Sequence, residues 1–125
     1  MFNFERFSGV GDKWDDRISL TKSHFIGLPH AFCEKHRVAD FNYVELFFDK
    51  EKKAIAFKFL KDKSDSCYRL NYSEANRSAS ISARSFLRFY DIDPLKYSGK
   101  YPAVIVPDET IGPIYVIELK EHEPT

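Results

Sequence analysis

The sequence predicts one mainly β domain with two short helices, an α+β fold in which two strand–helix–hairpin repeats form a compact, barrel-like body. The chain has 125 residues, the usual size of a single domain. Hydrophobic residues make up 43% and aromatic residues 16%, so the chain has enough apolar material to bury a core. The order strand, helix, hairpin occurs twice, at residues 17–61 and 78–120.

An N-terminal arm, residues 1–16, precedes the first repeat, and its aromatic side chains indicate that it packs on the body. Residues 17–21 alternate in hydrophobicity and residues 25–28 are extended and apolar, so we expect a strand at each. Pro29 fits the first position of a helix, because its missing N–H costs nothing there. We expect this helix to continue to about Arg37.

Two runs rich in aromatic and branched residues, 43–48 and 54–60, flank turn-forming residues and predict a β-hairpin. A further strand is expected at residues 68–72, where apolar and polar residues alternate. The second repeat consists of a strand at 80–83, a helix at 84–90 with Ser82 as its N-cap, and hairpin strands at 101–106 and 113–119.

The composition excludes several classes of protein. No apolar run approaches the roughly 18 residues that cross a bilayer, so we expect no membrane association. The start of the chain lacks a signal-peptide pattern, and two cysteines, Cys33 and Cys67, suit free thiols in a reducing compartment. We therefore expect a cytoplasmic protein.

Charge is balanced overall but uneven along the chain. The 19 basic residues equal the 19 acidic ones. Residues 50–100 hold twelve basic and six acidic side chains, whereas residues 101–125 hold one basic and five acidic. A basic middle segment suits a polyanion. We favour a second interpretation, in which these lysines are solvated at strand edges and turns, where they discourage aggregation.

The segment from Phe25 to Pro29, the helix-length spacer to Arg37, then Val38 and the strand from Tyr43 resemble the AbrB-type swapped-hairpin module. In that family, a strand ending in an apolar–Pro step opens a short helix, and an apolar residue then leads into a paired hairpin. The resemblance implies an internally duplicated, pseudo-dimeric module. The whole chain also resembles a group of small bacterial proteins with no assigned function, most clearly at residues 4–7, 49–51 and 80–87.

AbrB-type proteins are DNA-binding regulators, so the resemblance implies a non-catalytic DNA-binding role in transcription regulation. The family's Gly-Arg pair falls here on His24 and Phe25, and its helical arginines fall on Cys33 and Glu34. Other basic residues remain nearby. We expect phosphate contacts with double-stranded DNA from Arg17, Lys22, Lys35, Arg37, Arg84 and Arg88.

The replaced arginines, the zero net charge and the aromatic arm favour an alternative function. In it, the chain is a protein–protein interaction module, such as an inhibitor or an accessory factor of a mobile element, and its partner is a protein. The duplicated halves suit a monomer, and a homodimer is also compatible with them.

Three potential metal ligands, His30, Cys33 and His36, recur at three-residue spacing on the expected helix, with His24 nearby. We favour a structural interpretation, because Cys33 suits a small buried hydrophobe and His36 shares the core-facing side of the helix with Phe32. No base is positioned by the sequence to activate either cysteine. We therefore expect no metal, no cofactor and no enzymatic activity.

Two further patterns each have two interpretations. Paired carboxylates at residues 15–16 and 91–93 suit acid–base chemistry in a cleft, but in loops they are ordinary turn residues. The strand at 68–72 interleaves aromatic and basic side chains, as surfaces that bind single-stranded nucleic acid do. Because alternation buries one face of a strand, we favour a core position for Tyr68, Leu70 and Tyr72.

Overall fold

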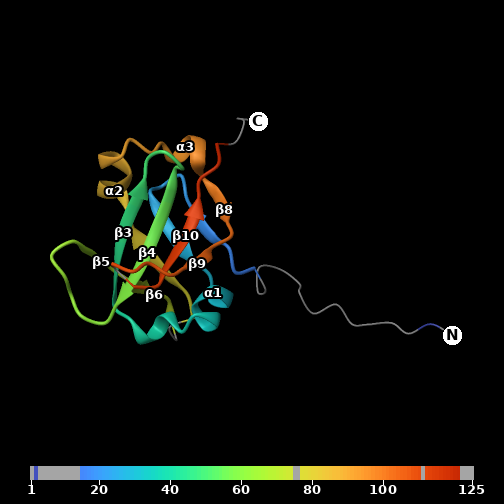
Figure 1. The fold of residues 1–125 in the computed structure, drawn as a ribbon. Helices are drawn as coiled ribbons and strands as arrows, with labels where there is room; N and C mark the ends of the chain where they lie inside the picture. Colours follow the sequence, from blue (N-terminus) through green and yellow to red (C-terminus); the bar gives the residue numbers. More distant parts are fainter. Residues whose placement is uncertain (1, 3–14, 75–76, 111, 122–125) are drawn as a thin grey trace.

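The computed structural model describes residues 2, 15–74, 77–110 and 112–121. Most of the predicted N-terminal arm, residues 1–16, therefore lies outside the described residues. The described part contains strands, three short α-helices and one 3-10 helix (Figure 1). In chain order these are β1 (Ile18–Leu20), β2 (Phe25–Leu28), α1 (His30–Lys35), η2 (Val38–Asp40), β3 (Tyr43–Asp49), β4 (Ala54–Leu60), β5 (Cys67–Arg69), β6 (Asn71–Tyr72), β7 (Ala79–Ser82), α2 (Arg84–Phe89), α3 (Pro94–Tyr97), β8 (Gly99–Tyr101), β9 (Val104–Val106) and β10 (Ile114–Glu118).

The strands form two antiparallel five-stranded sheets, so the prediction of a mainly β, α+β fold is confirmed. Sheet A has the order β6-β7-β2-β1-β8, and sheet B has the order β5-β3-β4-β10-β9. Within sheet A, β2 pairs with β7, and Ile26 lies opposite Ile81. Within sheet B, β4 pairs with β10, and Ala56 lies opposite Val116. Each of these four strands also pairs with its neighbour in sequence: β2 with β1, β7 with β6, β4 with β3, and β10 with β9.

The expected closed barrel is wrong, because the two ladders stay separate within the described residues. The chain instead passes from one sheet to the other at two bends. At one bend, Leu70 is buried between β5 of sheet B and β6 of sheet A. At the other, Pro102 and Ala103 separate β8 of sheet A from β9 of sheet B. Pro102 has no N–H to donate to a ladder, which explains why the strand expected at residues 101–106 is divided.

The core lies between the sheets, where strand alternation directs the apolar side chains. Sheet A contributes fully buried Ile18, Ile26 and Ile81, and sheet B contributes Ile55 and Phe57. These residues belong to one continuous cluster. Every second side chain of these strands is buried, and a shift of one residue would expose it, so this alternation determines the register of both sheets.

The helices close opposite ends of the two layers, with α1 at one end and α2 and α3 at the other (Figure 1). Both α1 and α2 end in the same way. Arg37 follows α1 with φ of 53° and Asp91 follows α2 with φ of 55°, a left-handed conformation that terminates helices. The next residue, Val38 or Ile92, is buried. Helix α1 therefore ends at Lys35, two residues before its expected end.

Two features of the second half differ from expectation. Ala83 rather than Ser82 is the residue that precedes α2, and no side chain caps that helix. Helix α3 was not predicted from the sequence. Pro94 occupies its first turn, and the Asp93 carboxylate accepts a hydrogen bond from the Leu95 N–H at 2.9 Å. The Asp93 carboxylate thus serves local backbone geometry.

Two tyrosines of the strand predicted at residues 68–72 pack against the core, as expected, with Leu70 buried between them. The hydroxyl of Tyr72 donates a hydrogen bond to the Val38 carbonyl at 2.6 Å. These rings are therefore not arranged as a stacking surface. In the described part of the chain, no helix has the length and apolar character that a membrane span requires.

Replacing Phe57 with alanine should lower the free energy of unfolding by about 3–5 kcal/mol, because its ring is fully buried in sheet B. Urea denaturation measures the change. Phe89→Ala is the matched control, since the Phe89 side chain is 79% exposed, and it should change stability by less than about 0.5 kcal/mol. Equal effects of the two substitutions would contradict the described core.

Candidate functional site

A row of small and polar side chains crosses the outer face of sheet A. Lys100, Ser19, Gly27, Ser80 and Asn71 lie opposite one another on successive strands from β8 to β6. Their neighbours along each strand point into the core, so this row points away from it. With strands about 4.8 Å apart, the row is about 19 Å long. The small side chains in this row let another molecule approach the backbone of sheet A.

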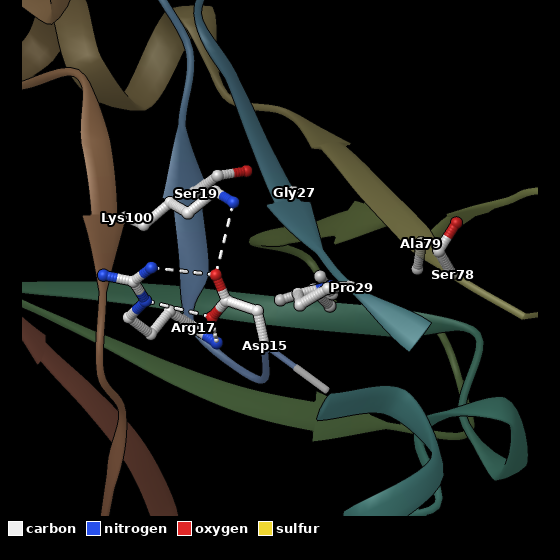
Figure 2. Close-up of a pocket in the computed structure, with 9 residues that line it drawn as sticks. Asp15, Arg17, Ser19, Gly27, Pro29, Ser78, Ala79 and Lys100 are labelled. Atoms are coloured by element: carbon white, nitrogen blue, oxygen red, sulfur yellow. Dashed lines mark hydrogen bonds and ion pairs between the residues drawn. The ribbon is translucent and has the colours of Figure 1, made fainter. Parts of the chain in front are cut away.

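Gly27 at the middle of the row lies against the Ser19 hydroxyl, which would have to rotate away if position 27 carried a Cβ atom. A Cβ atom at this position would lie 2.5 Å from the Ser19 Oγ atom, which is too close for two unbonded atoms. The Ser19 side chain therefore occupies the space that a larger residue would need. A shallow cavity of about 280 Å³ opens beside this pair, and Pro29 and Ser78 also line it (Figure 2).

Asp15 holds two cations at the edge of this cavity (Figure 2). The Arg17 guanidinium donates to both carboxylate oxygens, at 2.9 Å each, and the Arg17 backbone N–H donates at 3.0 Å. The Lys100 ammonium lies 3.2 Å from Oδ2. These hydrogen bonds, led by that of the Arg17 side chain, hold the pKa of Asp15 well below its usual range. One carboxylate thus partly neutralises both cations.

Of the six basic residues predicted to contact phosphate, three form an ion pair with a carboxylate within the described residues and three do not. Within the described residues, no ion pair engages Lys22, Arg84 or Arg88, and all three are exposed. The other three are each held by a carboxylate: Arg17 by Asp15 at 2.9 Å, Lys35 by Asp16 at 3.3 Å, and Arg37 by Asp40 at 3.6 Å.

Two groups of cations lie at opposite ends of β1. The Ala83 N–H donates to the His24 carbonyl at 3.0 Å, which brings the β1–β2 turn with Lys22 beside the start of α2 with Arg84. Arg17 stands before the other end of β1. Arg17 precedes β1 and Lys22 follows it in the turn to β2, so the length of the strand separates the two groups.

Two further cations, Lys100 on this face and Arg77 near the start of α1, were not predicted as phosphate contacts from the sequence. Lys100 lies opposite Ser19 in the ladder, a register that only the folded sheet reveals. Arg77 lies beside the start of α1, where its carbonyl accepts a hydrogen bond from the His30 Nδ1–H at 3.0 Å. The alternation of Lys100 with buried Tyr101 was the available signal, and the sequence analysis did not use it.

The structure gives separate partners to the three residues considered as metal ligands. The His30 Nε2 atom pairs with Glu34 at 3.2 Å, and the Cys33 thiol contacts the Leu28 carbonyl at 3.5 Å. The His36 ring packs against Phe32, with 4.6 Å between centroids, and burial lowers its pKa. Among the described residues, no three His, Cys, Asp or Glu side chains converge as a metal site would require.

Comparisons with known proteins give no further guidance, since no family model, no curated protein and no solved structure matches this chain.

Asp15→Asn should lower the melting temperature by about 2–4 °C at pH 7, because it removes a carboxylate whose ionised form the fold stabilises. A carboxyl with a depressed pKa contributes stability above its unfolded pKa of about 4, and loses it as the pH falls. The difference from wild type should therefore narrow below about pH 4. Asp62→Asn in an exposed loop is the control, and a pH-independent difference would contradict this assignment.

The two thiols should react at very different rates. Burial raises the pKa of Cys33 to about 11, so this thiol remains protonated and inaccessible at neutral pH. Cys67 is half-exposed at the edge of sheet B. A chromogenic disulfide reagent should label one thiol quickly in the native protein. Cys67→Ser should abolish the fast reaction and Cys33→Ser should preserve it, whereas the reverse pattern would refute the placement of both.

Proposed function

We propose that this protein is a non-catalytic regulator of the AbrB-like type that binds double-stranded DNA through the outer face of sheet A. The observation that carries the proposal is the polar row, with Arg17 and Lys100 around Asp15 at one end of β1 and the segments of Lys22 and Arg84 side by side at the other. The proposal places the protein in the cytoplasm, where its free thiols stay reduced.

The strand order supports a duplicated module. In sheet A, the four strands β6-β7-β2-β1 are symmetric about their centre. If β1 is equated with β6 and β2 with β7, exchanging the two halves leaves the strand order unchanged. The same is true of β3-β4 against β10-β9 in sheet B. Both six-residue helices end at a left-handed residue followed by a buried aliphatic one. Such a chain is a pseudo-dimer of two strand–helix–hairpin halves and needs no second subunit to complete its core.

His24 supplies a further link to the AbrB-type pattern. The resemblance places the family's glycine at this position, and glycine is the residue that most readily adopts positive φ. His24 has φ of 70°, so the backbone keeps the glycine-like conformation although the residue differs. The adjacent Phe25, at the family's arginine position, is 42% exposed.

The chemistry of the outer face suits a duplex. Phosphate contacts fix a protein on DNA without reading its sequence, and lysine and arginine make most of them. Two cationic groups at opposite ends of one strand can contact phosphates on both sides of one groove. The serine and glycine row between them lets the backbone approach the duplex. Asp15 competes with phosphate for Arg17 and Lys100, and it therefore limits the affinity.

A second candidate function, a protein–protein interaction module, is favoured by a different surface. The outer face of sheet B exposes apolar side chains, and Val104 and Val106 on β9 are 58% and 38% exposed. Contiguous apolar surface of this kind marks binding sites for other proteins.

Fluorescence anisotropy with a labelled random-sequence duplex tests the DNA-binding proposal. Lys22→Ala combined with Arg84→Ala should weaken binding about tenfold at low salt, and should lower the slope of log affinity against log salt by about 2. Asp15→Asn should strengthen binding, because it releases two cations.

Lys58→Ala combined with Lys63→Ala is the matched control, since it removes the same charge away from the polar row and should leave the salt slope close to wild type. Absence of DNA binding at low salt, or an equal loss in the control, would refute the proposed interface.

A further inference from the structure

We infer that the outer face of sheet B binds an extended apolar segment of another protein that carries lysine or arginine at its ends, and that this segment adds as a strand along β9. The inference rests on the second candidate function, the protein–protein interaction module, and specifies the chemistry of the partner.

A groove of about 490 Å³ runs along this face. Its floor consists of small side chains at the centre, including Ala54, Ala56 and Val116, and Phe47 and Val106 also line it. Outward-facing positions of a solvated sheet are normally polar. At this groove sheet B departs from that rule, since Ala56, Val104 and Val116 face outward, so this part of sheet B is suited to binding a partner that covers it.

The edge of the sheet next to the groove is also available. Within the described residues, β9 pairs only with β10, through Val104, Ile105 and Val106. All three side chains are exposed. An extended peptide that joins such an edge gains main-chain hydrogen bonds, and its alternate side chains lie beside Val104 and Val106 at the rim of the groove. Pro102 and Pro107 bound β9 on both sides, so the added strand is limited to a short segment.

The charges that line the groove indicate what kind of segment binds there. Three carboxylates, those of Asp49, Asp108 and Glu118, line the groove, and Lys52 is the one cation among its lining residues in the described part of the chain. A second copy packed face to face would bring two acidic rims together, and like charges at an interface oppose association. A segment with basic ends places its charges beside these carboxylates, so a cationic, apolar strand is favoured over a second copy.

A synthetic labelled peptide provides the test, with a core of alternating valine and threonine and two lysines at each end. It should bind the full chain in fluorescence anisotropy. The same peptide with glutamates in place of lysines should bind at least tenfold more weakly. A version with a central proline, which cannot complete the ladder, should also lose binding.

A triple variant, Asp49→Asn, Asp108→Asn and Glu118→Gln, removes the acidic charge. Asparagine retains the oxygens that accept backbone N–H groups from Lys52 and Thr110, so the turns are preserved. Affinity for the lysine peptide should fall about tenfold and become insensitive to salt. The control variant Asp62→Asn, Asp65→Asn and Glu74→Gln changes the net charge equally and should bind as wild type does.

The possible failures are distinguishable. Equal binding of lysine and glutamate peptides would overturn the charge inference and leave sheet B as a peptide-binding face. Absence of binding by every peptide would overturn the interaction-module function as well. A concentration-dependent dimer that Val106→Lys dissociates would show that a second copy occupies the groove. DNA affinity of the triple variant should be no weaker than wild type in each case, because that proposal concerns sheet A.

Discussion

The antiparallel pairing of β2 with β7, together with that of β4 with β10, is the constraint on which the rest of the structure depends. These two pairs join the halves of the chain at the middle of both sheets. Because the strands run in opposite directions, the helices that follow β2 and β7 lie at opposite ends of the molecule (Figure 1). The same pairing sets Gly27 opposite Ser80, at the centre of the polar row. The strand pairing that forms the core therefore also sets the positions of the polar side chains on the outer face of sheet A.

The two sheets present surfaces of opposite character. Both bury apolar side chains inward, but sheet A turns serine, glycine and lysine outward, whereas sheet B turns valine, alanine and phenylalanine outward. Sheet A has cations at both ends of β1, and the groove of sheet B has a surplus of carboxylates. One small domain with zero net charge can therefore carry a face suited to an anion and another suited to a cationic protein segment.

Local patterns in the sequence were sufficient to predict most of the strands and the first two α-helices. The hairpin of β3 and β4, the short strand before each helix and the core positions of residues 68–72 follow from alternation and turn chemistry. The bends at Leu70 and Pro102 were not predicted, because the alternation at residues 68–72 and 101–106 does not show that the chain passes from one sheet to the other there. The same holds for the site. The sequence suggested Arg17, Lys22 and Arg84 as phosphate contacts, which no structural observation tests. The pairing of Lys100 with Asp15 and its position opposite Ser19 depend on cross-strand register, which no local pattern encodes.

The central claim is that duplex DNA contacts the outer face of sheet A. Amide chemical-shift mapping by NMR, during titration with a short duplex at low salt, tests it most directly. The account predicts that the largest shifts fall on Ser19, Gly27 and Ser80 and on the turn that contains Lys22, and that they reverse when salt is added. Shifts confined to β9 and β10, or no shifts at any DNA concentration, would contradict it.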